Sequence, residues 1–418
     1  MRNWAGNYAY RALGLHRPTT LEQVQEIVAS AQRLRLLGSR HSFTDIGDSA
    51  ELLSLDELPT EVAVDHADGT VSFTANLSYG ELIGVLNREG LALANLASLP
   101  HISVAGAVAT ATHGSGDRNG NLATAVAAME LVTSDGEVLT VSRGESDFNG
   151  FVVGLGALGA VTRITLDVEP AYQVRQRVFE GLRWDALFEH LDAITSTGYS
   201  VSAFTRWGET VDQVWVKSRV TAAPELAREQ LFGAPAATVD RHPILGLDAV
   251  NCTPQLGVPG PWSERLPHFR LGYTPSSGVE IQSEYLVPRR HAAAGIGAVR
   301  ARGATVAPLV QVSEIRTVAA DELWMSPQCG QDTIGIHFTW FPDQEAVEGA
   351  LVDIEASLAP FGARPHLGKL FMAGSATIAQ LYQRHGDFTT LVGRMDPRGV
   401  FRNDWLESRV LGHPCGAN

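Results

Sequence analysis

The chain has 418 residues, 44% of them hydrophobic, and a formal net charge of −14. Its length predicts two domains, and its acidity argues against binding to nucleic acid or to an anionic membrane surface, because both require clustered Lys and Arg. Three widely spaced cysteines, no secretion signal and no apolar run of the ~20 residues that span a membrane predict a cytoplasmic protein without a metal site.

The first third of the chain alternates helix and strand signals. Residues 20–23 have the spacing of a helix capping box, and apolar residues then recur every three or four positions up to a short strand at 34–37. Asp68-Gly69 separates two β-branched runs and predicts a hairpin. A second capping box at 78–81 opens a helix that stops at Gly90. Two β/α blocks are therefore expected here.

A loop of small and donor-bearing residues, 36–43, follows the first of these strands. Gly38 lets the main chain approach a ligand, and successive N–H groups, serine hydroxyls and the Arg40 cation suit a pyrophosphate. His41 lies inside the loop, and its imidazole is largely neutral, hence nucleophilic, near neutral pH. From this loop alone, an ordinary polar strand-to-loop turn is the favoured interpretation.

A stretch of small residues at 97–116 is the second unusual feature. From Ser103 on, almost no side chain exceeds Val in size, so a flat cofactor can lie against the main chain. A tightly packed loop or helix is the simpler alternative.

Further on, the stretch 154–159 matches the dinucleotide fingerprint G-x-G-x-x-G, but a strand-like run at 160–168 follows it where that fingerprint requires a helix. We therefore predict no Rossmann unit there.

In the second half of the chain, polar residues interrupt apolar strands. The strand 334–340 has Ile, Phe and Trp on one face and leaves His337 and Thr339 on the other. The same two-residue spacing places Glu314 beside Arg316, and Lys369 follows a glycine. Spacing alone favours a same-face ion pair, a half-exposed strand and a surface lysine.

Together these stretches resemble the flavin-binding signature of the vanillyl-alcohol-oxidase type of FAD enzymes. Gly-Ser-Arg-His-Ser-Phe at 38–43 and Ala-Ser-Leu-Pro-His-Ile-Ser-Val-Ala-Gly at 97–106 are similar to the alditol (xylitol) oxidase branch, and the similarity covers most of the chain. The resemblance implies an α+β, two-domain flavoprotein. Residues 1–171 and 370–418 would form a bipartite FAD-binding domain of the PCMH type, and 172–369 an α+β cap domain with a mostly antiparallel sheet.

The resemblance also assigns residues to the site. It implies FAD bound covalently by an 8α-histidyl bond through His41, with His337 and Lys369 catalytic. The expected polyol-binding residues are Ser98, Glu314, Arg316, His337, Thr339 and Lys369. The expected cofactor-binding residues are Leu36, Leu37, Gly38, Ser39, Arg40, His41, Ser42, Ser98, Ser103, Gly106, Ala107, Val108, Ala109, Val161 and His366. Ala107 and Ala111 replace the Ser and Gly common in the family, which is a conservative departure.

The activity implied is oxidation of the C1 hydroxyl of alditols such as xylitol and sorbitol to the aldose, with dioxygen reduced to hydrogen peroxide. His337 is the favoured base and Glu314 the second candidate, because a carboxylate beside Arg316 stays ionised and weakly basic. Two alternatives remain: an aldonolactone-type FAD dehydrogenase or oxidase with another electron acceptor, and a non-catalytic carbohydrate-binding protein. The expected partners are a polyol and dioxygen, and a monomer is expected.

Overall fold

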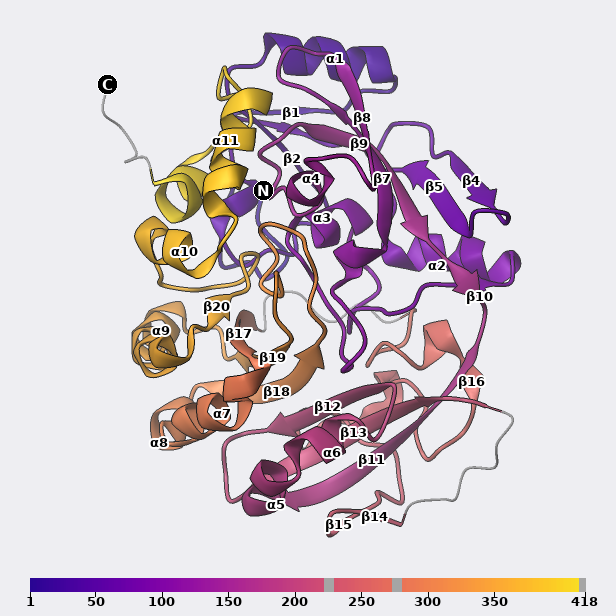
Figure 1. Ribbon diagram of the computed structural model, residues 1–418, viewed down its shortest axis with the longest axis vertical. Helices are drawn as coiled ribbons and strands as arrows, with labels where there is room; N and C mark the ends of the chain where they lie inside the picture. Colours follow the sequence, from indigo (N-terminus) through magenta and orange to yellow (C-terminus); the bar gives the residue numbers. More distant parts are fainter. Residues whose placement is uncertain (222–228, 273–279, 413–418) are drawn as a thin grey trace.

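The computed structural model describes residues 1–221, 229–272 and 280–412, which form an α+β fold. Figure 1 shows two parts along the longest axis, with the N-terminal strands and helices in the upper part and a larger sheet in the lower part. In the described part of the chain, no helix is both long and apolar enough to cross a membrane. The expected α+β class with a mostly antiparallel sheet is confirmed.

The upper part contains two main sheets. A parallel three-stranded sheet has the order β1 (Gly14–His16), β3 (Glu51–Leu53) and β2 (Leu34–Leu36). An antiparallel five-stranded sheet has the order β4 (Val62–Asp65), β5 (Thr70–Thr74), β9 (Ala160–Asp167), β7 (Val126–Val132) and β8 (Val138–Ser142). A two-stranded pair, β6 (Leu91–Ala92) with β10 (Glu169–Pro170), lies where the chain leaves for the lower part.

The local signals in this part give the elements that they predict. The β4–β5 hairpin turns at Gly69, which has a φ of +64°. Helix α1 (Leu21–Ser30) begins where the Thr20 side chain accepts from Gln23 N, and α2 (Tyr79–Arg88) has a complete capping box between Ser78 and Glu81. Because caps and turns use only nearby residues, they are readable from a short window of sequence.

A short helix precedes the glycine-rich 154–159 stretch, and another is formed by the small-residue stretch. Helix α4 (Phe148–Val152) precedes the glycines, and strand β9 follows them. The absence of a Rossmann unit at this point is therefore confirmed, because that unit needs the opposite order of elements. The small residues after Ser103 form helix α3 (Val104–Ala109).

The lower part is built on one large antiparallel sheet. Its eight strands have the order β16 (Gly260–Pro261), β11 (Gln173–Arg183), β13 (Thr210–Arg219), β12 (Ser200–Thr205), β18 (Val310–Val318), β19 (Thr333–Trp340), β17 (Ile281–Pro288) and β20 (Arg364–Pro365). Its helices are α5 (Trp184–Glu189), α6 (Leu191–Thr195), α7 (Ala292–Arg300), α8 (Gly303–Val306) and α9 (Gln344–Leu358). A small hairpin, β14 (Gln230–Leu231) with β15 (Ala234–Pro235), lies beside β11.

The C-terminal segment packs against the upper part. It contains α10 (Ser375–Leu381), α11 (His385–Met395) and α12 (Asp404–Leu406), which lie beside the N-terminal strands in Figure 1. Leu34 N donates to Val400 O at 2.7 Å, and the buried Arg35 guanidinium donates to Phe401 O at 2.9 Å. The same guanidinium also bonds Gly156, Ile46 and Leu155 carbonyls. The boundaries 171 and 369 themselves stay predictions.

Candidate active site

A cavity of about 610 Å³ lies between the 36–43 loop and the large sheet. Eighteen of the predicted site residues line it, although they come from both halves of the chain. They are Leu36, Leu37, Gly38, Ser39, Arg40, His41, Ser42, Ser98, Ser103, Gly106, Ala107, Ala109, Val161, Glu314, Arg316, His337, His366 and Lys369. Volumes of about 300–1,000 Å³ are typical of small-molecule and cofactor sites.

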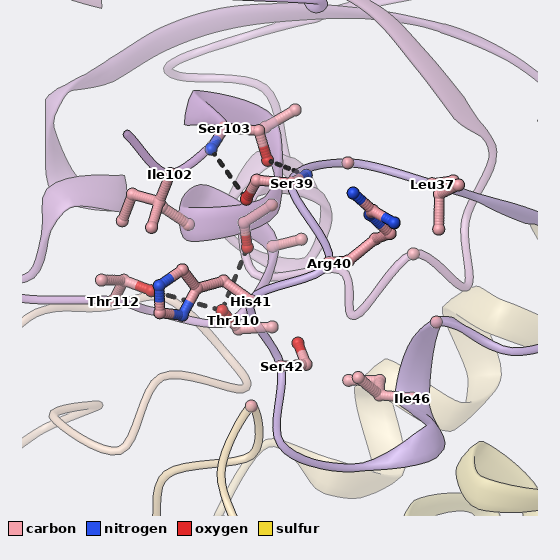
Figure 2. A pocket seen from close by; sticks show the side chains of 18 of the residues that line it. Leu37, Ser39, Arg40, His41, Ser42, Ile46, Ile102, Ser103, Thr110 and Thr112 are labelled. Atoms are coloured by element: carbon pink, nitrogen blue, oxygen red, sulfur yellow. Dashed lines mark hydrogen bonds between the residues drawn. The ribbon is translucent and has the colours of Figure 1, made fainter. Parts of the chain in front are cut away.

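Ser39 and Ser103 join the loop to the start of α3 (Figure 2). Ser39 N donates to Ser103 Oγ at 3.4 Å, and Ser103 N donates to Ser39 Oγ at 3.1 Å. The Ser103 hydroxyl lies between two glycines, because a Cβ on Gly38 would come within 2.6 Å of Ser103 Oγ and one on Gly106 within 2.7 Å. The two predicted stretches are therefore held in contact by glycines that have no room for a side chain.

The loop changes direction at Arg40, whose φ is +59°. Its side chain and that of His41 leave the loop in different directions in Figure 2. Further along, Phe43 N donates to Gly368 O at 3.1 Å. This main-chain hydrogen bond holds the 36–43 loop next to the turn that carries Lys369.

His41 is enclosed by aromatic rings. Trp4 stacks on it with centroids 4.3 Å apart, and Phe43 meets it edge-on at 6.1 Å. His101 Nε2 lies 3.0 Å from His41 Nε2. Burial, followed by the neighbouring His101, lowers the pKa of His41 to about 3, so the ring is neutral at physiological pH.

The upper end of this cavity fits FAD on the groups present. Glycines and alanines leave main chain exposed to a flat ring, and the Arg40 cation and serine hydroxyls suit a pyrophosphate. His101 Nδ1 is buried and has no hydrogen-bond partner among the described residues. A buried polar atom of this kind is expected where a bound group completes the site.

The lower end is a row of ionisable side chains across three neighbouring strands. His337 on β19 is paired in register with Glu314 on β18 and with Glu284 on β17. Ile336 and Phe338, on the opposite face of β19, are fully buried in the core. Strand alternation thus directs His337 into the cavity, as the sequence pattern predicts.

Glu284 is the centre of this row, and its side chain is fully buried. Its carboxylate oxygens lie 2.7 Å from Lys369 Nζ, 3.0 Å from Arg316 Nη2 and 3.2 Å from His113 Nε2. Burial alone would raise the pKa of Glu284, but Arg316 and Lys369 hold it well below its ordinary value. The carboxylate stays ionised and fixes two cations at the cavity wall.

His337 and Lys369 form a hydrogen-bonded pair. Lys369 Nζ is 2.9 Å from His337 Nδ1, and Thr339 Oγ1 is 3.2 Å from His337 Nε2. Burial, followed by the Lys369 charge, lowers the pKa of His337 to about 4. Burial lowers the pKa of Lys369 also, while Glu284 opposes this shift. The imidazole is therefore neutral, and both of its nitrogens already have partners.

Glu314 lines the cavity and also contacts a buried pair of side chains, His268 and Lys217, behind it. Its Oε1 is 2.9 Å from His268 Nε2, and Lys217 Nζ is 3.1 Å from His268 Nδ1. Burial raises the pKa of Glu314, but Arg316 and His268 outweigh it and hold it well below its ordinary value. Burial lowers the pKa of Lys217 to about 7. Glu314 is thus an anchored carboxylate that accepts hydrogen bonds.

Two predicted residues do not line the cavity. Val108 is fully buried in the apolar core, because it lies on the inner face of the short helix α3. Thr339 lies behind His337 and contacts that ring instead of the cavity.

Among the described residues, Arg316 Nε is buried without a hydrogen-bond partner at the cavity wall, which leaves a donor for a ligand.

Sequence reasoning missed Glu284, Gln282, His113, His268 and Lys217. Glu284 and Gln282 lie two residues apart on β17 and share its face, so two polar residues at strand spacing were the available signal. His268 has no such signal, because it lies outside any strand or helix.

Among the described residues, no group of three or more His, Cys, Asp or Glu is arranged to hold a metal ion.

Comparison with known proteins gives two family models and several similar relatives. Residues 12–142 match the model for an FAD binding domain, and 279–409 match that for D-arabinono-1,4-lactone oxidase. The alditol oxidase of a Streptomyces species is 47% identical over 98% of this chain and 99% of its own length. The L-gulono-1,4-lactone dehydrogenase of Mycobacterium tuberculosis is 27% identical over 98% of both chains.

The fold has solved counterparts as well. A crystal structure of cholesterol oxidase from B. sterolicum superposes with a TM-score of 0.78 over 97% of this chain and 95% of that chain. Its sequence identity is 15%, so this likeness concerns the fold alone.

Proposed function

The chain belongs to the alditol oxidase family of FAD-dependent flavoproteins, and on that premise we propose that it oxidises the C1 hydroxyl of an alditol such as xylitol or sorbitol to the aldose, with dioxygen reduced to hydrogen peroxide. The observation that carries this proposal is the row of Glu314, His337 and Glu284 with their two cations beside the FAD-type loop. A polyol has many hydroxyls and no charge, and these side chains both donate to and accept from hydroxyls.

The polyol would lie along this row. Arg316 Nε offers a free donor, and the ionised Glu314 accepts from hydroxyls. Ser98 lines the same cavity. An analogue without a hydroxyl would leave one of these buried groups unpaired, which gives such a site its selectivity.

FAD, when bound, supplies the hydride acceptor and passes the electrons to dioxygen. The chain's own task is to hold the alcohol and take its proton, because an alcohol is a poor hydride donor until that proton leaves. Lys369 Nζ already bonds Glu284 and His337, and an ammonium group has three protons. Its third position can bind the C1 oxygen.

His337 reaches the substrate through Lys369, since its two nitrogens face Lys369 and Thr339. Once Lys369 Nζ has given a proton to His337 Nδ1, it is a neutral amine whose lone pair can take the hydroxyl proton, so the pair acts as one base. An imidazole with a pKa of about 4 is a weak base, so it accepts the proton only as the C–H bond breaks. The Lys369 cation also stabilises negative charge on the substrate oxygen.

We also propose that FAD is attached covalently through His41, at the 8α-methyl carbon. The support is a neutral imidazole, deep in the cofactor end of the cavity and fixed by stacking on Trp4. If the linkage exists, acid precipitation leaves the flavin with the protein. His41→Ala should release it, and free flavin from the wild-type protein would contradict the linkage.

The lactone-oxidising alternative has weaker support. The model for D-arabinono-1,4-lactone oxidase matches residues 279–409, but the lactone dehydrogenase relative is 27% identical, against 47% for the alditol oxidase. Peroxide release in air, measured with xylitol, sorbitol, glycerol and two aldonolactones, tests the proposal. Peroxide from polyols but not lactones is expected, and the reverse pattern would favour the alternative.

A further inference from the structure

A histidine and a lysine lie behind the cavity wall and have no task in the proposed reaction. His268 is 6% exposed and Lys217 is 1% exposed. Lys217 Nζ lies 3.1 Å from His268 Nδ1, and His268 Nε2 lies 2.9 Å from Glu314 Oε1. Burying an ionisable group costs free energy unless it is paired, and here each group has the next one as its partner. The line starts in the core and ends at a carboxylate that lines the cavity.

The His268 ring is held between two aromatic side chains. Phe204 and Trp215 both meet it edge-on, each with ring centroids 5.3 Å away. Its main chain is held as well, because Thr253 N donates to His268 O at 2.9 Å. These contacts keep the ring in place, with Nε2 at hydrogen-bond distance from Glu314.

Lys217 determines which ring nitrogen of His268 carries the proton. Its Nζ donates to Leu266 O, and it lies 3.3 Å from Pro267 O and 3.1 Å from His268 Nδ1. An ammonium group has three protons and no lone pair, so each of its partners must accept. Nδ1 is therefore the unprotonated ring nitrogen. Nε2 carries the proton and donates to Glu314.

The charges around the ring maintain this arrangement. Among the described residues, Lys217 from β13 and Glu314 and Arg316 from β18 are the charged groups that face it. Burial, followed by the Lys217 charge, lowers the pKa of His268 to about 4, whereas burial lowers the pKa of Lys217 to about 7. Cys252 also lies near Lys217, and burial raises the pKa of its thiol to about 12, so it is uncharged. Near pH 6 the lysine is therefore charged and the imidazole neutral.

Glu314 has a protein donor on each of its carboxylate oxygens. His268 bonds Oε1, and Arg316 Nη1 lies 3.4 Å from Oε2. A carboxylate can accept about four hydrogen bonds, so lone pairs remain for a ligand in the cavity. Without His268, Oε1 would lose its donor, and the carboxylate would no longer be held in one orientation.

We propose that His268 is a positioning residue of the polyol site: held in its Nε2–H form by Lys217, it keeps Glu314 ionised and oriented to accept from a substrate hydroxyl. The inference rests on the function proposed above and gives a task to two residues outside the cavity. Since the hydroxyl proton goes to other groups, loss of His268 should weaken substrate binding more than it slows flavin reduction.

Anaerobic stopped-flow reduction by xylitol near pH 6 separates these two effects, because it yields both the Kd of xylitol and the limiting rate. His268→Leu should raise the Kd by about 10–100-fold, which is what one hydrogen bond to a charged group is worth, and leave the limiting rate close to that of wild type. His268→Gln supplies an amide N–H in place of Nε2–H and should recover most of the lost affinity.

His242→Leu is the matched control. His242 packs against Phe269, the residue after His268, and its ring bonds Ile244 N and lies outside the cavity. This variant should bind xylitol as wild type does. Wild-type affinity in His268→Leu, or a His268→Gln protein that binds as weakly as His268→Leu, overturns the proposal.

A double variant tests whether Lys217 acts through His268. Lys217→Met keeps the length of the side chain but removes its three protons, so it should weaken xylitol binding. Lys217→Met combined with His268→Leu should bind xylitol no more weakly than His268→Leu alone, because the two residues belong to one line of contacts. Losses in Kd that add up in the double variant overturn this order of action.

A measurement that needs no substrate separates this inference from the proposed function. In nitrogen NMR of wild type, the His268 ring, assigned by its loss in His268→Gln, should be neutral with the proton on Nε2 near pH 6. In Lys217→Met the pKa of His268 should rise, because the neighbouring charge that lowers it is gone. A cationic or Nδ1–H ring in wild type refutes the inference whatever the substrate is. A wild-type flavin that xylitol does not reduce refutes the proposed function, and the inference with it.

Discussion

His337 decides whether the site can take a proton from an alcohol. Its pKa of about 4 means that the ring is protonated, and unable to accept, only below that pH. The rate of flavin reduction should therefore fall on the acid side with a midpoint near 4 and show no step of this group between 5 and 8. Stopped-flow reduction in the absence of oxygen, followed against pH, measures it. A midpoint at the ordinary histidine value would contradict the environment described for His337.

Replacing His337 by Ala tests its role directly. A lost general base should slow flavin reduction by about 10²–10⁴-fold, with reoxidation by oxygen nearly unchanged. Glu314→Gln is the matched comparison, because Glu314 lies next to His337 in the same row but is expected to bind and not to accept the proton. If His337→Ala reduces flavin at the wild-type rate and Glu314→Gln does not, Glu314 is the base.

Glu284 holds Arg316 and Lys369 at the cavity wall, so its charge should matter more than its shape. In Glu284→Gln, the amide keeps the volume but leaves both cations without their counter-charge, and breaking a buried ion pair costs about 3–5 kcal/mol. We expect lower stability in urea and a loss of turnover with xylitol at unchanged flavin content. Glu355→Gln is the control, because Glu355 bonds Tyr285 and Met372 outside the cavity. Equal losses in both variants would contradict a special role for Glu284.

The residues that sequence reasoning found and those it missed differ in kind. His41, Glu314 and Lys369 lie in motifs that resemble a known family, so they were predictable without geometry. Glu284 and His113 meet only through the tertiary fold, because Glu284 lies on β17 and His113 in a loop 171 positions earlier in the sequence. Contacts of that kind depend on sheet order, which local patterns do not contain.

At the scale of elements, strand β2 joins the N-terminal part to the C-terminal segment. The buried Arg35 guanidinium donates to four carbonyls, of Gly156, Phe401, Ile46 and Leu155. Arg35→Met should lower the free energy of unfolding by about 3 kcal/mol or more, since each buried acceptor left without a donor costs about 1–3 kcal/mol. Urea denaturation of the full chain measures this loss.

Arg33→Met is the matched control for that change. Arg33 lies just before the same strand and pairs with Glu407 at 3.4 Å, but its side chain is 46% exposed. An exposed pair of this kind contributes about 0–1 kcal/mol. If both arginine variants lose stability equally, Arg35 does not tie the segments together as described.

The glycine at the start of the cofactor loop gives a prediction about an element and not about chemistry. A Cβ on Gly38 would lie 2.6 Å from Ser103 Oγ, so Gly38→Ala should displace the hydroxyl that joins the loop to α3. We expect weaker FAD retention during gel filtration. Gly14→Ala on β1 has no atom within 4 Å of its new Cβ and should retain FAD normally. Equal retention in both would show that the loop tolerates a side chain.

The helices, hairpins and strands near the chain's N-terminus were predictable because their signals are local. The Thr20 cap of α1, the capping box of α2 and the turn at Gly69 each involve a few neighbouring residues. The order of the eight-stranded sheet was not, because β12 lies between β13 and β18, more than a hundred residues further on. The sequence signals such strands without indicating their neighbours.

At the scale of the whole molecule, the upper and lower parts contribute different residues to the cavity. The FAD-type loop belongs to the upper part, whereas Glu284, Glu314 and His337 belong to strands of the lower sheet. The cavity lies where they meet, so cofactor and substrate would bind to different parts of the chain. We propose that the lower part, about residues 172–369, determines which alcohol is oxidised.

The central claim is that a polyol reduces this protein's own flavin and that oxygen reoxidises it. The most direct test is an anaerobic titration of the purified yellow protein with xylitol, followed by admission of air. The account predicts that an equimolar amount of xylitol bleaches the flavin and yields the aldose, and that air restores the colour with an equimolar release of peroxide. A flavin that stays oxidised with xylitol and sorbitol but is bleached by an aldonolactone would contradict it.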